Sequence, residues 1–69
     1  MKAKDLRDRG TDDLRELDKR LTHDLFQYRF KNHTGGLDDT SLVRKTRRDI
    51  ARVRTELAAR ERAAKDEAR

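Results

Sequence analysis

The sequence predicts an all-α fold, a long antiparallel two-helix hairpin with a short N-terminal helical arm. Apolar residues recur at helical spacing in two segments, 11–34 and 38–66. Proline is absent, and the only glycines among the 69 residues are Gly10, Gly35 and Gly36. Because glycine and proline are the main local helix breakers, the segments are divided at these glycines. We expect one helical-hairpin domain over 1–69, with its arm at 1–9.

The composition leaves little apolar material for a core. Charged residues make up 48% of the chain, against about a quarter in an ordinary globular domain. Eight Leu, one Ile, two Val and two Phe fill 13 of the 69 positions. A chain this short buries only about 60% of the surface that its unfolded form exposes. A deep, water-free substrate cavity is therefore nearly excluded, and we expect neither an enzyme nor a small-molecule substrate.

Other features of the composition bear on compartment and partner. Cysteine is absent, which excludes a disulfide framework and a thiolate metal site and suits a reducing compartment. No apolar run approaches the roughly 18 residues of a membrane span, and no signal-peptide core follows Met1. We expect a cytoplasmic protein with no membrane partner. The net charge of +5 favours nucleic acid or another polyanion.

One apolar residue predicts how the arm packs, and a row of apolar residues at helical spacing predicts the first helix. Leu6 is the one large apolar residue of the arm after Met1, and we expect it to pack a helical turn onto the hairpin. Thr11 is the expected N-cap of the first helix, followed by two aspartates that favour the positive end of the helix dipole. One stripe, about 80° wide on a helical wheel, carries Leu14, Leu17, Leu21, Leu25 and Tyr28.

The second helix follows a glycine-containing turn. Gly35 suits the left-handed position that ends the first helix. If Asp38 is the next N-cap, Leu37 and Leu42 are spaced as a hydrophobic staple. Beyond Ala59 large apolar residues are missing, so we expect a solvated helix that frays. The stripe of the second helix consists of Val43, Ile50, Val53 and Leu57, with Thr46 filling its gap.

The positive charge is concentrated in the second helix. Between positions 44 and 54, six basic residues stand against one acidic residue, and five of the six are Arg. The planar guanidinium of Arg binds phosphate oxygens in a bidentate manner. On a helical wheel, Arg44, Arg48 and Arg52 lie opposite the apolar stripe, and Arg47 and Arg54 flank it. This clustering favours a ridge for a nucleic-acid backbone over the alternative, a merely solvated face.

Two aromatic residues lie off the apolar stripe of the first helix. Phe26 and Phe30 are one turn apart on the side away from the second helix, with Arg29 and Lys31 beside them. An exposed pair of this kind usually marks a contact site, for a protein partner or for an unpaired RNA base. The alternative is that both rings curl back at the closed end of the hairpin and complete its core.

The sequence gives little support to a catalytic or metal site. On a helix, His23 and Asp24 diverge by about 100° and cannot share a metal ion. No acidic pair converges with His33, and Ser41 has no evident base. We expect no catalytic residue, no metal and no cofactor.

Four stretches carry a resemblance to a known family: MKAKDLR at 1–7, LFQYRF at 25–30, TGGL at 34–37 and RRDIARVRT at 47–55. Their order and spacing, from Met1 to about Leu57, resemble the bacterial large-subunit ribosomal protein twenty-nine family. The resemblance implies a long helical hairpin on the surface of the large ribosomal subunit, near the exit of the nascent-chain tunnel. Implied partners are the large-subunit ribosomal RNA and the neighbouring ribosomal protein twenty-three, with signal recognition particle and trigger factor docking close by.

The leading hypothesis is therefore a structural, non-catalytic, RNA-binding protein of the bacterial ribosome. By the resemblance, Arg47, Arg48 and Arg52 match the basic motif of the family, and Arg29 matches the basic position in its Leu-Phe-x-x-Arg-Phe motif. The alternative is a helical protein-interaction hairpin that docks a partner through Phe26 and Phe30. The full set of expected RNA-binding residues is Lys2, Lys4, Arg7, Arg9, Arg29, Arg44, Lys45, Arg47, Arg48, Arg52 and Arg54.

Overall fold

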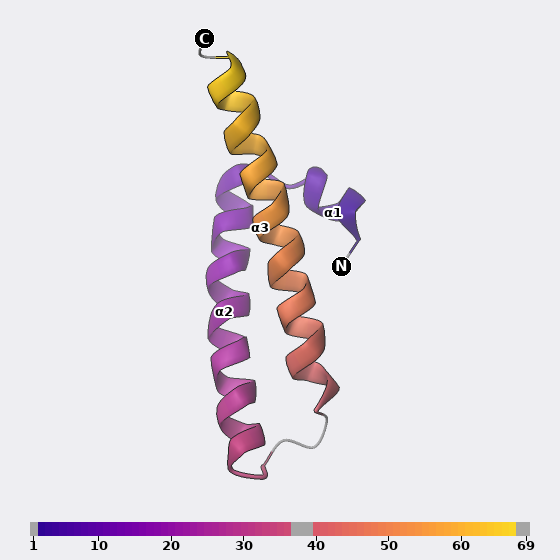
Figure 1. The fold of residues 1–69 in the computed structure, drawn as a ribbon, viewed down its shortest axis with the longest axis vertical. Helices are drawn as coiled ribbons and strands as arrows, with labels where there is room; N and C mark the ends of the chain where they lie inside the picture. Colours follow the sequence, from indigo (N-terminus) through magenta and orange to yellow (C-terminus); the bar gives the residue numbers. More distant parts are fainter. Residues whose placement is uncertain (1, 37–39, 68–69) are drawn as a thin grey trace.

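The computed structural model describes residues 2–36 and 40–67, and this part of the chain forms three helices. Helix α1 spans Ala3–Arg7, α2 spans Thr11–His33 and α3 spans Ser41–Glu67. The two long helices lie side by side and antiparallel, and α1 packs against α3 (Figure 1). The molecule is a rod 51 Å long and 19 by 15 Å across. The predicted all-α hairpin with a short helical arm is confirmed.

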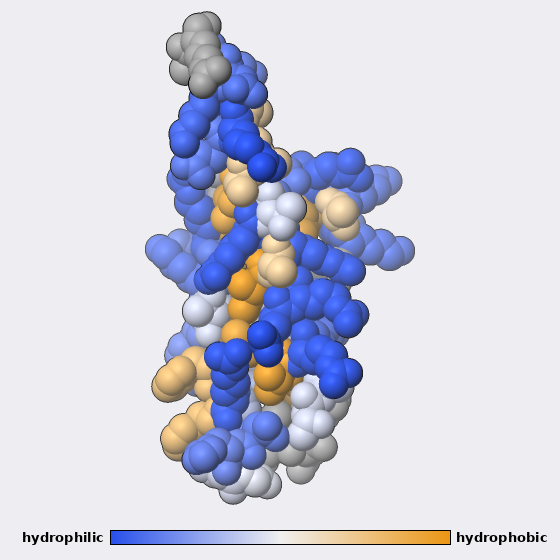
Figure 2. All heavy atoms as spheres, in the orientation of Figure 1, coloured by the Kyte–Doolittle hydropathy of each residue, from blue (hydrophilic) through white to orange (hydrophobic). Residues whose placement is uncertain are grey.

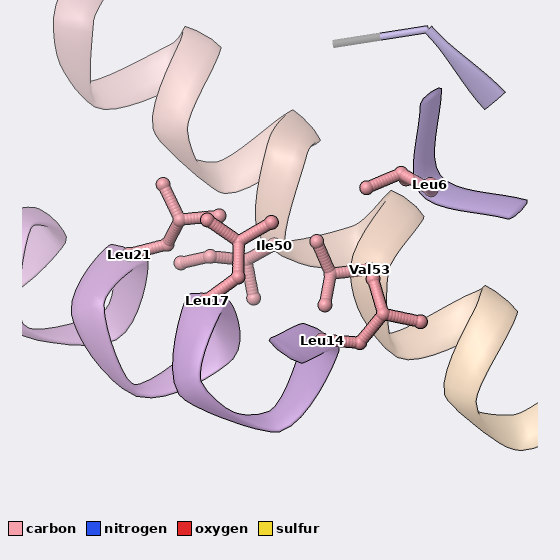
Figure 3. Close-up of a cluster of buried hydrophobic side chains, with 6 residues drawn as sticks. All are labelled: Leu6, Leu14, Leu17, Leu21, Ile50 and Val53. Carbon is pink, nitrogen blue, oxygen red and sulfur yellow. The ribbon is translucent and has the colours of Figure 1, made fainter. Parts of the chain in front are cut away.

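One narrow apolar seam joins the three helices. Its members are each at most 9% exposed, and Figure 3 shows them converging from α1, α2 and α3. The arm takes part in this seam, because Leu6 is only 2% exposed. In Figure 2 the hydrophobic atoms form a thin band between the long helices, flanked by hydrophilic side chains. The seam consists of Leu6, Leu14, Leu17, Leu21, Ile50 and Val53.

The seam loosens toward the closed end of the hairpin. Leu25 and Tyr28, the last members of the α2 stripe, are half-buried, and so is Val43 near the start of α3. Thr46 is buried, as its place in the stripe predicts. The tightest packing therefore lies where α1 joins the long helices, and the closed end leaves more of its surface to solvent.

The start of α2 differs by one residue from the prediction. Gly10, not Thr11, is the N-cap: its backbone is extended (φ −67°, ψ 157°) and its carbonyl accepts a hydrogen bond from the Leu14 N–H at 3.0 Å. Thr11 is the first residue of the helix instead, and its hydroxyl accepts a hydrogen bond from Arg60 at 3.2 Å.

The end of α2 is a Schellman motif. The Gly36 N–H donates to the Lys31 carbonyl at 2.8 Å and the Gly35 N–H donates to the Asn32 carbonyl at 3.2 Å. Gly35 has φ 79°, the left-handed conformation that side chains with a Cβ rarely adopt. The predicted left-handed role of Gly35 is confirmed, and it turns the chain back toward α3.

The start of α3 also differs from the prediction. The helix begins at Ser41 rather than at 38, and Thr40 forms a turn before it. The proposed N-cap Asp38 and the staple residue Leu37 lie outside the described residues. At its other end α3 runs to Glu67, past the start of α2 (Figure 1), and 61–67 are all exposed.

Arg60 links all three helices through hydrogen bonds. Its Nη2 donates to the carbonyl oxygens of Leu6 and Arg7, at 3.2 and 3.1 Å, in the last turn of α1. Its Nη1 donates to Thr11 Oγ1 on α2, and its Nε forms an ion pair at 3.2 Å with Glu56 on α3. The negative end of the helix dipole also stabilises a cation that lies near the last carbonyls of the helix. Arg60 therefore holds α1 at a fixed place on the hairpin.

The expectation of a fully solvated end after Ala59 was wrong for Arg60, whose side chain is only 24% exposed. Its partners on α1 and α2 lie 49 to 54 positions away in the sequence. Helical periodicity reports only neighbours three or four positions apart, so it could not identify these contacts.

We predict that Arg60→Met lowers the free energy of unfolding by about 1–3 kcal/mol, because a hydrogen-bonded charged group typically contributes that much. The change keeps an unbranched side chain that can pack where the Arg stem does, and it removes the hydrogen-bond donors. Arg62→Met, at an exposed position two residues later, should alter stability by less than about 0.5 kcal/mol. Urea denaturation of the full chain, followed by circular dichroism, measures both. Equal effects would contradict the role of Arg60.

A second prediction concerns the depth of the seam. Val53 is 0% exposed and Val43 is half-buried on the same helix. The substitution Val→Ala at each position therefore compares the stability cost at a buried and at a half-buried site. Val53→Ala should cost about 2 kcal/mol from lost burial and the cavity that remains, and Val43→Ala about half of that or less. The same denaturation assay compares them, and a larger loss for Val43→Ala would show that the core lies elsewhere.

Candidate nucleic-acid interface

Three Arg side chains surround one hollow near the closed end of the hairpin. Successive turns of α3 place Arg44, Arg47 and Arg48 along its wall, and all three are exposed. Asn32 from the end of α2 and Thr40 from the turn line the same hollow. Guanidinium groups gathered at an open polar hollow can bind several phosphate oxygens at once. This hollow is the first part of the candidate site.

A second depression lies between α1 and α3. Ala3 and Leu6 of the arm and Ala51 of α3 contribute its apolar surface. Arg48 and Arg52, one helical turn apart, also line it. Arg48 borders both depressions and therefore stands at the centre of the candidate site. The sequence did not predict this groove, because a helical-wheel projection of α3 contains no information about where the arm packs.

The exposed surface of α3 from 44 to 52 carries charge of one sign. The single acidic residue in that stretch, Asp49, is buried at 9% exposure, whereas the five basic residues are all exposed. Just beyond the stretch, Glu56 is held by Arg60 at 3.2 Å. The burial of Asp49 thereby leaves the exposed surface from 44 to 52 without an acidic side chain, whereas Glu56 lines the groove beside Arg48 and Arg52. The cations of this surface, the basic face, are Arg44, Lys45, Arg47, Arg48 and Arg52.

The arm adds cations on the α3 side of the molecule. Lys2, Lys4 and Arg7 are exposed, and α1 packs mainly against α3. The fold thus brings the arm and the basic face together on one side. Arg29 is exposed on α2, and Arg9 lines a separate hollow along α2 with residues of mixed charge.

Arg54 has a partner of its own on α2. Its Nε donates to Asp18 Oδ1 at 3.1 Å, and its Nη2 lies 3.5 Å from Thr22 Oγ1. The Arg54 side chain stays 60% exposed, so this ion pair stabilises the hairpin only weakly. Its position beside the seam, predicted from the wheel, explains the contact across the helices. Its binding to RNA stays a prediction.

Phe26 and Phe30 do not take part in the core. Their exposed fractions are 70% and 63%, the largest among the big apolar side chains of the described residues. The alternative in which both rings fold back and complete the core is therefore wrong. Leu25 and Tyr28 occupy the inward positions of this part of α2. The Phe pair is a surface feature, and its partner stays a prediction.

Both histidines are exposed, and His23 lines the hollow along α2 together with Asp13 and Glu16. Across 2–36 and 40–67, no three His, Asp or Glu side chains come close enough together to hold a metal ion. In the same residues, no helix is both long and apolar enough for a membrane span.

Comparison with known proteins gives consistent matches over most of the chain. The family model described as Ribosomal L29 protein matches residues 4–60. Large ribosomal subunit protein uL29 of Sorangium cellulosum is 59% identical over 63 residues, covering 91% of this chain and 94% of that protein. The proteins of the same name from Geotalea daltonii and Lactobacillus acidophilus are 45% and 43% identical, over 87% and 84% of this chain and 97% and 89% of theirs. No solved structure matches the chain.

Proposed function

Since the chain belongs to the ribosomal L29 protein family, we propose that it binds large-subunit ribosomal RNA through α1 and the basic face of α3. The family consists of structural proteins of the large ribosomal subunit and is not a family of enzymes, so the chain is a ribosomal protein of the cytoplasm. What we propose beyond family membership is the identity of the residues that bind the RNA.

One observation carries this proposal: from 44 to 52, every exposed charged side chain of α3 is basic. Such a surface neutralises backbone phosphates and releases the counterions condensed on the RNA. Phosphate contacts position a protein on nucleic acid but contain little sequence information. Recognition would therefore depend on the shape of the folded RNA and on the fixed spacing of the cations along a rigid helix.

The residues have different expected parts in this contact. Arg48 borders both depressions, so it would contact the backbone most closely, with Arg44 and Arg47 on one side and Arg52 on the other. Arg54 would contribute less, because Asp18 already accepts a hydrogen bond from it. Further positive charge would come from Lys2, Lys4, Arg7, Arg29 and Lys45, which are all exposed.

The proposal extends to the surroundings of the protein on the ribosome. The family resemblance supports a place near the exit of the nascent-chain tunnel, beside ribosomal protein twenty-three. Signal recognition particle and trigger factor would then dock nearby. A rod whose most basic stretch lies on α3 suits such a surface position, because the exposed Phe pair on α2 stays open to neighbours.

A protein-interaction hairpin is the second candidate function, and the exposure of Phe26 and Phe30 favours it. A protein of the large subunit contacts both RNA and other proteins, so the two functions do not exclude each other. A partner that stays bound in a pull-down after nuclease treatment would support the second function, and a partner lost on treatment would count against it.

We predict that Arg48→Glu weakens binding to purified large-subunit ribosomal RNA by at least about 10-fold, since it replaces an attraction by a repulsion at the centre of the basic face. The control Arg62→Glu makes the same charge change at an exposed position in the last turns of α3, outside the basic face. It should weaken binding by less than about 3-fold. Filter-binding titration measures both, and equal losses would refute a localised interface.

Binding should also weaken as the salt concentration rises. A plot of log affinity against log salt should fall linearly, and Arg48→Gln should make its slope shallower by about one, the share of one phosphate contact. The same filter assay, repeated over a range of potassium chloride concentrations, gives the slope. An affinity that does not change with salt would overturn the proposed phosphate contacts.

A further inference from the structure

The Phe pair is an apolar surface that the hairpin itself does not use. Phe26 and Phe30 are spaced i, i+4, which places them as neighbours on one face of α2. The half-buried Leu25 and Tyr28 supply the inward packing here, and the buried seam of α2 ends at Leu21. In Figure 2, hydrophobic side chains stand out from the surface along the lower part of α2, among hydrophilic ones. Exposed rings of this kind mark a binding surface.

The side chains beside the rings offer a set of chemical groups that suits a nucleotide. Gln27 and Lys31 line one shallow hollow together with the two rings. The rings present flat π faces, the Gln27 amide both donates and accepts hydrogen bonds, and the Lys31 ammonium attracts a phosphate. An unpaired nucleotide has the matching parts: a flat base, a polar base edge and a phosphate.

The charge around the pair also favours nucleic acid over a protein partner. Between positions 24 and 33 of α2, two Lys or Arg residues stand beside the rings against one acidic residue, Asp24, which is half-buried. Arg29 and Lys31, next to the rings on α2, are exposed. A protein docked on these rings would need its own acidic rim to avoid unpaired positive charge. A nucleotide needs nothing further, because each one carries a phosphate.

We propose that Phe26 and Phe30 form a stacking site for an unpaired base of the ribosomal RNA, with Gln27 at the base edge and Lys31 at the phosphate. The inference rests on the proposed RNA-binding function and adds a second contact on α2. The basic face holds the RNA backbone, whereas the Phe pair holds a base that has left its helix. The protein would thereby recognise an unstacked nucleotide at one point of the RNA shape.

Conservative substitutions separate stacking from simple apolar burial. The double variant Phe26→Leu/Phe30→Leu keeps an apolar surface but loses the flat rings, and it should bind purified large-subunit ribosomal RNA about 10-fold more weakly. Phe26→Tyr/Phe30→Tyr keeps the rings and should bind within about 3-fold of wild type. Because stacking neutralises no phosphate, the salt slope should stay unchanged in both variants. Circular dichroism should show wild-type helix content, since both positions are exposed.

Fluorescence provides a second readout, because the chain contains no tryptophan. Phe30→Trp introduces a single indole fluorophore at the proposed site, and RNA binding should quench it as a base stacks on the indole. Arg62→Trp places the control fluorophore at an exposed position on the last turns of α3, and its emission should change little. Quenching in the Phe30→Trp variant should saturate at the RNA concentration that saturates filter binding.

The outcomes distinguish the two proposals. If wild-type protein does not bind the RNA, the proposed function fails and the stacking site fails with it. If wild type binds while the Leu double variant binds equally well, only the stacking site is overturned. If the Leu variant keeps RNA affinity but loses a nuclease-resistant protein partner in a pull-down, the Phe pair is a protein-docking surface and the inference is wrong.

Discussion

The whole molecule depends on one narrow apolar seam. Six side chains, each at most 9% exposed, join three helices in a chain of which 48% is charged. A seam this thin covers only one side of each helix, so every other side must face solvent or a partner. Burial decides which groups are hidden, and the same burial leaves Arg44, Arg48 and Arg52 on the outer surface of α3. The interface proposed for RNA is thus a direct consequence of how little the protein can bury.

Polar contacts of Arg60 add to the apolar seam in holding the three helices together. Arg60 fixes the carbonyl ends of α1 and reaches Thr11 of α2, so the arm stays on the α3 side. That position brings Lys2, Lys4 and Arg7 to the same side as the basic face. A contact that stabilises the fold therefore also concentrates positive charge. The stability of the arm and the electrostatics of the proposed RNA contact depend on the same guanidinium.

The sign of the surface charge is as important as its amount. Asp49 lies within the most basic stretch of the sequence, yet its burial leaves the exposed part of that stretch purely cationic. Asp18 and Glu56 each form an ion pair with an arginine. On α2, the Phe pair stands out from a surface that also carries Arg29 and Lys31. Together these features give the rod two different kinds of group for the proposed RNA contact, cations for the backbone and aromatic rings for an unpaired base.

The sequence by itself determined the helices, the turn and the family. Apolar spacing identified both long helices, Gly35 identified the turn, and four short stretches identified the ribosomal L29 relationship, because these are signals between neighbours along the chain. Tertiary structure alone decided the rest: the Arg60 contacts, the burial of Asp49, the Arg54–Asp18 pair and the groove beside α1. Each depends on how one helix is rotated and placed against another. A helical wheel describes one helix at a time and contains no information about that placement.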